Sequence, residues 1–235
     1  MDGMDAELFP RDRTEIAPGA VHVPDWLDGD GQRELLRACR GVGTAARRAA
    51  HGPHSGRRHH DRPAGLPGLA LVPVRLRPYG RRRRRRPGEA LPGLARRTGR
   101  RAVTDALGAE AASGAPFDIA LINFYGADAR MGMHRDGDEK SHAPVVSLSL
   151  GDSCVFRFGN TGTRARPYTD VELRSGDLFV FGGPSRLAYH GVPRVLPGTA
   201  PRRLGLTGRL NVTLRVSGFR AGEPPDERIM GDSPS

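Results

Sequence analysis

The feature that most constrains this fold is a series of short strand-like segments between residues 117 and 216. Apolar and polar side chains alternate within these segments, and Gly, Pro or Asp interrupts the chain between them. Many short strands separated by turn signals predict a closed or sandwiched antiparallel sheet, of which the jelly roll is one form. We therefore expect a mainly β core with helices packed outside it. The expected strands are Phe117–Tyr125, Ala143–Leu150, Ser153–Phe158, Asp170–Leu173, Asp177–Phe181 and Arg209–Val216.

Upstream of this core, residues 1–40 predict a strand, a turn and a helix that belong to the same domain. The strand surrounds Val21, and Asp30 has the side chain of a helix N-cap. A second helix is expected over Arg100–Ala112, and residues 220–235 are expected to form a flexible tail. At 235 residues, the chain is long enough for one domain with a sizeable core.

The positive charge of the chain is concentrated in residues 41–98. This segment has 15 Arg and 2 acidic residues, so its net charge is +13. The rest of the chain has 22 basic and 24 acidic residues, a net charge of −2. Because the segment has no sustained helical or strand period, it is predicted to be a disordered basic linker that could bind phosphate backbones.

Composition also restricts the cellular setting and the cysteine chemistry. No apolar run approaches the length of a membrane span, and the N-terminus lacks the pattern of a secretory signal. We therefore expect a cytoplasmic protein that does not enter a membrane. A monomer is the simplest expectation for its assembly, which composition does not determine. Cys39 and Cys154 lack any paired spacing, so they predict neither a disulfide framework nor a zinc site, and we expect two buried, inert thiols.

Three residues have the character of a metal site. His134 and Asp136 lie two positions apart, so on an extended segment both side chains point to the same face, and His190 lies 54 residues after Asp136. Two histidines and one carboxylate on one face of a metal form the ligand set of non-haem Fe(II) oxygenases and leave three coordination positions open. Taken alone, a His-x-Asp pair also fits a structural polar cluster.

A candidate anion site accompanies the metal residues. Arg209, Asn211 and Arg215 share one face of an expected strand at a period of two. Two buried guanidiniums that face one way are costly unless an anion neutralises them, and a dicarboxylate would do so. Asn123 and Tyr125 alternate in the same way on another strand, where they can donate hydrogen bonds to a carboxylate or serve as core-edge residues.

Together these segments resemble the AlkB family of Fe(II)- and 2-oxoglutarate-dependent dioxygenases, with matching order and spacing over residues 100 to 219. The resemblance implies a double-stranded β-helix and the oxidative demethylation of N-methylated bases, which releases formaldehyde, succinate and CO₂. It divides the chain into 1–40, the anomalous segment 41–98, a dioxygenase core 99–219 and the tail. The matching segments are Leu121–Tyr125, His134–Glu139, Ala143–Gly151, Phe158-Gly159, Gly176-Asp177, Gly182-Gly183, Ser185-Arg186, Tyr189–Gly191 and Arg209–Arg215.

The resemblance also assigns roles to individual residues. It implies alkylated single- or double-stranded DNA as the partner, with RNA as an alternative, and Fe(II), 2-oxoglutarate and O₂ as cofactor and co-substrates. It places Asp138, and also Arg164, against the substrate. The implied metal ligands are His134, Asp136 and His190, and the implied 2-oxoglutarate ligands are Asn123, Tyr125, Arg209, Asn211 and Arg215.

The resemblance is lost in residues 41–98, where the family has a nucleotide-recognition lid with aromatic residues that stack on an extruded base. Tyr79 is the one aromatic residue in this segment. If GC-rich codons are chosen for the same segment, reading them one nucleotide later gives an aromatic-rich, family-like sequence. We therefore hypothesise two compensating frameshifts, one near residue 41 and one near residue 99.

Two alternatives to a nucleic acid demethylase stay open at this point. One is a related hydroxylase of a protein or small molecule. The other is a catalytically impaired or non-catalytic jelly-roll protein with a disordered basic segment. A purely binding module would bind DNA equally well with a chelator present and would lose affinity steeply with salt.

Overall fold

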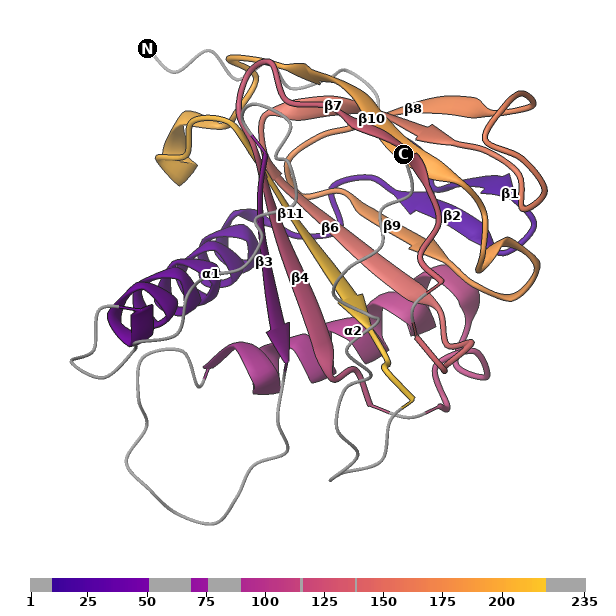
Figure 1. The fold of residues 1–235 in the computed structure, drawn as a ribbon, viewed down its shortest axis with the longest axis horizontal. Coiled ribbons are helices and arrows are strands. Elements are labelled where there is room, and N and C mark those ends of the chain that lie inside the picture. Colours follow the sequence, from indigo (N-terminus) through magenta and orange to yellow (C-terminus); the bar gives the residue numbers. More distant parts are fainter. Residues whose placement is uncertain (1–9, 51–68, 76–89, 115, 138, 219–235) are drawn as a thin grey trace.

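The computed structural model describes residues 10–50, 69–75, 90–114, 116–137 and 139–218. Two antiparallel sheets face each other, and two helices lie outside the larger sheet (Figure 1). The predicted mainly β, jelly-roll fold with flanking helices is therefore confirmed. The expected tail, residues 220–235, lies outside the described residues. No helix in the described part of the chain is long and apolar enough to cross a membrane.

In the described part of the chain, the larger sheet has seven strands and the smaller sheet has four. The larger contains β1 (Thr14–Ala17), β2 (Ala20–Val23), β3 (Leu69–Arg75), β4 (Ile119–Tyr125), β6 (Val145–Gly151), β9 (Leu178–Phe181) and β11 (Arg209–Arg215). The smaller contains β5 (Met131–His134), β7 (Ser153–Phe158), β8 (Thr169–Leu173) and β10 (His190–Leu196). Their spatial orders are β1-β2-β9-β6-β11-β4-β3 and β5-β10-β7-β8.

Helices α1 (Gly29–Ala50) and α2 (Ala90–Leu107) cover the outer face of the larger sheet. Helix α2 contacts β2, β6 and β9, and α1 packs against α2. Helix α1 is capped by Asp28, whose Oδ1 accepts a hydrogen bond from the amide of Gly31 at 2.8 Å. The prediction that Asp30 caps this helix is wrong, because Asp30 lies inside the first turn and pairs with Arg33.

The two faces of the larger sheet have different environments. On β11, Leu210, Val212 and Leu214 point to the helices and belong to the core beneath them. The alternating polar residues of the same strand point between the two sheets, as the period of two predicted. A second apolar cluster lies between the sheets, and its aromatic members are Tyr125, Phe156, Phe158, Phe179 and Phe181.

Regular structure occurs in parts of residues 41–98, where no period predicted it. Helix α1 continues to Ala50, β3 pairs with β4 along its whole length, and α2 begins at Ala90. Strand β3 includes Pro73 but lies at an edge of the sheet, where a missing amide hydrogen costs little. Helix α2 ends at Leu107 rather than at Ala112, because Gly108 adopts a φ of +92° that stops the helix.

Both cysteines are buried and unpaired, as expected. Burial raises the pKa of the Cys39 thiol to about 12 and also raises the pKa of Cys154. A thiol reacts through its thiolate form, so both groups are inert near neutral pH.

A buried carboxylate connects the N-terminal segment to β9. Asp177 is fully buried and accepts two hydrogen bonds of 2.7 Å from Arg11, and it lies 2.9 Å from Nε2 of His22. The amides of Asp25 and Arg174 also donate to it at 3.0 Å. Burial raises the pKa of the Asp177 carboxyl, but the hydrogen bonds from His22 and Arg11 outweigh burial and hold it well below its usual range.

We predict that Asp177→Asn lowers the free energy of unfolding near neutral pH by about 3 kcal/mol, because it leaves a buried cation without its anion. The pKa of Asp177 is lowered on folding, so its contribution is complete above the ordinary value of 3.8 and is lost as the pH falls below it. Urea unfolding near pH 7 and pH 3 should therefore show a smaller acid loss in the variant than in the wild type. Exposed Asp12→Asn is the control, and equal acid losses in wild type and Asp177→Asn would contradict this assignment.

Candidate metal centre

The pairing of β5 with β10 brings two histidines together. His134 ends β5, His190 begins β10, and the antiparallel register places them directly opposite each other. Their ring centroids lie 4.5 Å apart. Strand register therefore unites two side chains that are far apart in the sequence.

Gly191 allows this close approach. A Cβ atom at this position would lie 2.8 Å from the carbonyl oxygen of Met131 and 2.9 Å from that of Gly132. Both distances are shorter than van der Waals contact, so a side chain here would push β5 away from β10. The glycine after His190 thus sets the separation of the two imidazoles.

Asp136 completes the group from the loop that follows β5. One potential ligand atom from each of His134, Asp136 and His190 lies within 4.8 Å of the other two. The Nε2 atoms of His134 and His190 lie 3.8 and 3.7 Å from the two carboxylate oxygens of Asp136. Within the described part of the chain, Oδ2 of this buried carboxylate has no hydrogen-bond partner.

Backbone carbonyls orient both imidazole rings. Nδ1 of His134 lies 3.0 Å from the carbonyl oxygen of Gly132, and Nδ1 of His190 lies 3.0 Å from that of Ala188. A carbonyl oxygen can only accept, so each Nδ1 carries the hydrogen and each Nε2 keeps its lone pair. Metal-binding histidines are commonly held in this way, with the second ring nitrogen donating to a carbonyl or carboxylate.

The surroundings of His190 and Asp136 favour the protonation states that a divalent metal requires. Burial lowers the pKa of His190 to about 4, so this imidazole is neutral near pH 7. Burial also raises the pKa of the Asp136 carboxyl, but His190 and the Arg215 guanidinium outweigh that effect and bring the pKa below 3.8. Two imidazoles, one carboxylate and an unpartnered carboxylate oxygen fit Fe(II).

The predicted co-substrate residues line the interior face of the larger sheet. Strand β11 pairs with β4 so that Arg209 lies opposite Tyr125 and Asn211 lies opposite Asn123. All four residues are buried. The Tyr125 hydroxyl lies 3.7 Å from the sulfur of Met131 on β5, the strand that ends in His134, so the two sets of residues adjoin.

Arg209 is the strongest anion-binding candidate in this set. Its side chain is 1% exposed, and Nη2 donates to the hydroxyl of Ser149 at 3.0 Å. Its Nε and Nη1 atoms have no hydrogen-bond partner among the described residues, and neither has Oδ1 of Asn123. A buried guanidinium with unpaired donors is costly, and a carboxylate that accepts from either of these donors would offset part of that cost.

Asn211 and Arg215 are engaged differently from Arg209. Asn211 donates to the hydroxyl of Ser147 at 2.7 Å. Arg215 donates to Oδ1 of Asp136 at 2.6 Å and to Oε1 of Glu139 at 2.7 Å. Arg215 is thus bound to two carboxylates of the protein and stabilises the candidate metal ligand directly.

Glu139 and Arg186 are site residues to which the sequence assigned no role. The Glu139 carboxylate accepts from Arg215 and, at 3.0 Å, from Nη2 of Arg186, and both partners in the Glu139–Arg186 pair are 5% exposed. Arg186 also donates to the backbone oxygens of Asp136, at 2.6 Å, and Ala143, at 2.8 Å. This buried network holds the loop that carries Asp136, and no local sequence pattern reveals such a long-range pairing.

The structure describes one of the two predicted substrate residues, Arg164. Asp138 lies outside the described residues. Arg164 is exposed in the loop between β7 and β8, and its guanidinium lies 5.8 Å from the ring centroid of Tyr189. Tyr189 directly precedes His190, so Arg164 lies near a residue that is adjacent in sequence to a candidate metal ligand.

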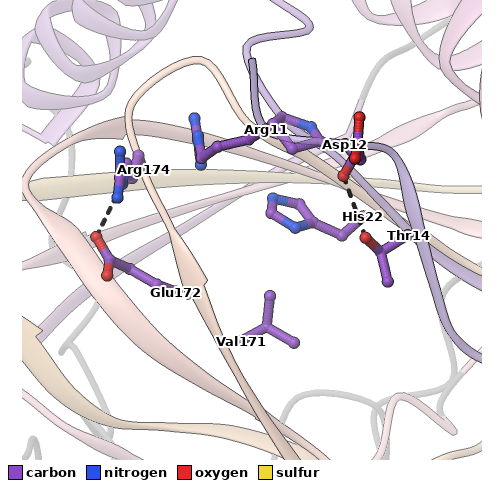
Figure 2. Close-up of a pocket in the computed structure, with 8 residues that line it drawn as sticks. Arg11, Asp12, Thr14, His22, Val171, Glu172 and Arg174 are labelled. Carbon is purple, nitrogen blue, oxygen red and sulfur yellow. Dashed lines mark hydrogen bonds and ion pairs between the residues drawn. The ribbon is translucent and has the colours of Figure 1, made fainter. Parts of the chain in front are cut away.

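An open hollow of about 360 Å³ lies elsewhere, between the β1–β2 hairpin and β8 (Figure 2). Figure 2 shows Arg11, His22, Glu172 and Arg174 around it, with the Arg174–Glu172 ion pair of 3.0 Å on one side. None of the candidate metal or co-substrate residues lines it. The chemistry of the molecule therefore lies between the sheets and not in this hollow.

A jelly roll with two histidines and one carboxylate at the end of the sheets defines the class of mononuclear non-haem metal proteins. Residues 19–215 match the model of the 2OG-Fe(II) oxygenase superfamily. The chain belongs to this family, whose members use Fe(II), 2-oxoglutarate and O₂. The predicted cofactor and co-substrates are therefore confirmed at the level of the family.

Individual relatives support the AlkB resemblance. The chain is 48% identical over 101 residues to the "Alpha-ketoglutarate-dependent dioxygenase AlkB homolog" of Caulobacter vibrioides, which covers 43% of this chain and 45% of that relative. It is 41% identical over 108 residues to the "DNA N(6)-methyladenine demethylase ALKBH1D" of Arabidopsis thaliana, over 42% of this chain and 24% of that relative. The match thus spans less than half the length of either curated relative.

Among solved structures, the chain is similar to OsALKBH1, with a TM-score of 0.60 and 28% sequence identity. This similarity covers 87% of the present chain and 99% of the other. It extends beyond the segment shared with the curated relatives and includes most of the fold.

We predict that Mn(II), a redox-stable substitute for Fe(II), raises the melting temperature of the wild-type protein, because a ligand that binds only the folded state stabilises it. His190→Ala should abolish this shift, since it removes one of three ligands. His142→Ala, which removes an exposed histidine outside the group, is the matched control and should keep the shift. Thermal unfolding with and without Mn(II) measures the effect, and an unchanged shift in His190→Ala would contradict the ligand assignment.

Proposed function

We propose that this chain is an Fe(II)- and 2-oxoglutarate-dependent dioxygenase that removes N-methyl groups from alkylated nucleic acid bases. The observation that carries this proposal is the juxtaposition of a three-ligand metal group with Arg209, a buried cation that has two donors without a partner among the described residues. A metal and a dicarboxylate together satisfy both features. The family membership supports the same pair of ligands.

The proposed reaction is an oxidative demethylation. When bound, the iron supplies the coupled oxidation in which one oxygen atom of O₂ enters succinate as 2-oxoglutarate loses CO₂ and the other hydroxylates the N-methyl group. The N–CH₂OH group then breaks at its C–N bond, so that formaldehyde leaves and the base regains its proton. The atoms balance, because N-methyl base, O₂ and 2-oxoglutarate give free base, formaldehyde, succinate and CO₂.

The residues of this chain bind and orient the reactants. We propose that Arg209 pairs with the distal carboxylate of 2-oxoglutarate while Ser149 holds the guanidinium in place. Arg215 keeps Asp136 ionised and oriented through its 2.6 Å contact. Asp138 and Arg164 are proposed to contact the substrate. The proposed metal ligands are His134, Asp136 and His190, and the proposed 2-oxoglutarate ligands are Asn123, Tyr125, Arg209, Asn211 and Arg215.

An aromatic cluster keeps water away from one side of the metal ligands. The rings of Phe156 and Phe181 lie 5.8 and 5.0 Å from that of His190, between centroids. Phe158 and Phe179 pack against them in the same cluster. A dry surrounding strengthens the charge interactions within the site and limits side reactions with water.

Nucleic acid is the proposed substrate because the resemblance and the relatives agree on it. The curated relatives include AlkB homologues and a protein named as a DNA N(6)-methyladenine demethylase. DNA is the first expectation and RNA is the alternative. A monomer that acts in the cytoplasm stays a prediction.

The frameshift hypothesis for residues 41–98 bears on this proposal, because the base-stacking lid is expected there. Resequencing of the coding DNA for residues 35–105 tests it. An aromatic-rich lid in the corrected frame would identify a complete repair enzyme as the protein to assay. The printed frame, if it stands, predicts turnover of 2-oxoglutarate that is poorly coupled to demethylation.

We predict that iron-loaded protein with the aromatic-rich lid of the corrected frame releases formaldehyde and succinate in equal amounts from an N-methylated single-stranded oligonucleotide. The printed chain should release succinate in excess of formaldehyde. Arg209→Met should raise the KM for 2-oxoglutarate about 10- to 100-fold, because a hydrogen bond to a charged group contributes about 1.5–3 kcal/mol. Arg202→Met, which removes an exposed arginine, should leave this KM unchanged. Formaldehyde and succinate are quantified in the same reaction.

Two outcomes would count against this function. An intact methylated strand, with 2-oxoglutarate consumed against a protein or small-molecule acceptor, would indicate the related hydroxylase. An unchanged KM in Arg209→Met would show that 2-oxoglutarate binds elsewhere.

A further inference from the structure

We propose that one edge of the smaller sheet binds single-stranded nucleic acid beside the metal centre, through two tyrosines and four arginines. We call this surface the tyrosine–arginine rim. The inference rests on the proposed function and adds the place where the strand next to the reacting base is held. The rim consists of Arg135, Arg157, Arg164, Arg166, Tyr168 and Tyr189.

The rim forms where four strands end side by side. His190 of β10 lies opposite His134 of β5 on one side and opposite Phe158 of β7 on the other, and Phe158 lies opposite Thr169 of β8. Neighbouring strands lie about 4.8 Å apart, so this row covers about 14 Å. Strands β10, β7 and β8 are seen side by side in Figure 1. The candidate metal ligands lie at one end of the row, and Tyr168 precedes its other end.

Gly159 keeps the middle of the rim flat. A Cβ atom at this position would lie 3.1 Å from the carbonyl oxygen of Tyr189, 3.1 Å from Cε of Met133 and 3.7 Å from Cβ of Tyr168. The two tyrosines therefore flank a position without a side chain, and both are partly exposed. An aromatic floor that is interrupted by a glycine can accept planar groups from solvent.

Each tyrosine is accompanied by two guanidiniums. Arg135 and Arg164 lie 5.6 and 5.8 Å from the ring centroid of Tyr189. Arg157 and Arg166 lie 4.0 and 5.3 Å from that of Tyr168. Guanidinium groups stack on nucleobases as aromatic rings do, and they pair with phosphates. The rim thus offers aromatic rings on which nucleobases can stack and, beside them, guanidiniums that can pair with the phosphates of the nucleic acid.

The loop that carries Arg164 and Arg166 is held by Asn160. Its side-chain amide donates to the carbonyl oxygens of Ala165, at 3.3 Å, and Pro167, at 3.2 Å, and its Oδ1 accepts from the amides of Gly162 and Thr163. The backbone oxygen of Asn160 accepts from the amide of Tyr189 at 2.9 Å. A loop ordered before binding loses less entropy when the ligand arrives.

The charge of the rim is opposite to that of the chain around it. Its four arginines and the neighbouring Asp170, which pairs with Arg157 at 2.7 and 2.8 Å, sum to +3. The chain outside residues 41–98 has a net charge of −2 with the rim included, so the remainder without the rim and Asp170 sums to −5. A local positive patch with exposed aromatic rings matches the way proteins bind single strands, by phosphate contacts and base stacking. An acidic peptide would use the charges but would leave the rings without partners.

The test measures the affinity of the full-length, Mn(II)-loaded protein for a fluorescein-labelled oligothymidylate of about 15 nucleotides by anisotropy. Tyr168→Ala should weaken binding about 5- to 100-fold, because stacking of a base on an aromatic residue contributes in that range, and Tyr168→Phe should restore it. Arg166→Ala should reduce the slope of log affinity against log salt by about 0.7 per lost phosphate contact. The matched control is Arg202→Ala, an exposed arginine that follows the opposite end of β10, and it should change neither quantity.

Unchanged affinity in Tyr168→Ala would overturn the proposal. Equal displacement of the strand from wild type and from Tyr168→Ala by an oligoglutamate of similar length would also overturn it. Failure of the rim is distinguishable from failure of the proposed function. Equal formaldehyde release from a methylated strand by wild type and Tyr168→Ala, with equal KM for the strand, would contradict strand binding at the rim and support the demethylase function. Strand binding that depends on Tyr168, without formaldehyde release, would support binding at the rim and contradict the demethylase function.

Discussion

The structure depends on five buried charges around the metal centre, four of which compensate one another. Asp136 and Glu139 bind Arg215 and Arg186 at distances of 2.6 to 3.0 Å, and Arg209 is held by one hydroxyl group. Each buried ion costs several kcal/mol unless it is paired. Three positive and two negative side chains leave a net charge of +1, which a divalent metal and a dicarboxylate dianion do not alter. The compensation ties β11, the loop after β5 and the turn before β10 into one unit.

Local periodicity predicted the parts of the fold and of the site that depend on strand geometry. The alternation on β11 places Arg209 and Asn211 inside and Leu210 under the helices, because successive side chains on a strand face opposite ways. The Glu139–Arg186 pair was not predictable, since it joins residues 47 positions apart that share no pattern. Strand β3 was not expected either, because its regularity comes from pairing with β4 rather than from its own sequence.

Positive charge gathers in two separate regions of this chain. Residues 41–98, with a net charge of +13, hold the excess of basic over acidic residues, and there the family resemblance is lost and a frameshift would explain the composition. A smaller amount is arranged by the fold itself, on the tyrosine–arginine rim that adjoins His134 and His190. The rim lies outside the anomalous segment, so its chemistry does not depend on how that segment is read. Single-strand binding and lid function can therefore be examined separately.

The measurement that tests the central claim most directly is anomalous diffraction from crystals grown with Mn(II) and 2-oxoglutarate. We predict one manganese peak bounded by Nε2 of His134, Nε2 of His190 and the carboxylate of Asp136, with a carboxylate of 2-oxoglutarate paired to Arg209. A peak at any other group of residues, or 2-oxoglutarate bound away from Arg209, would contradict it.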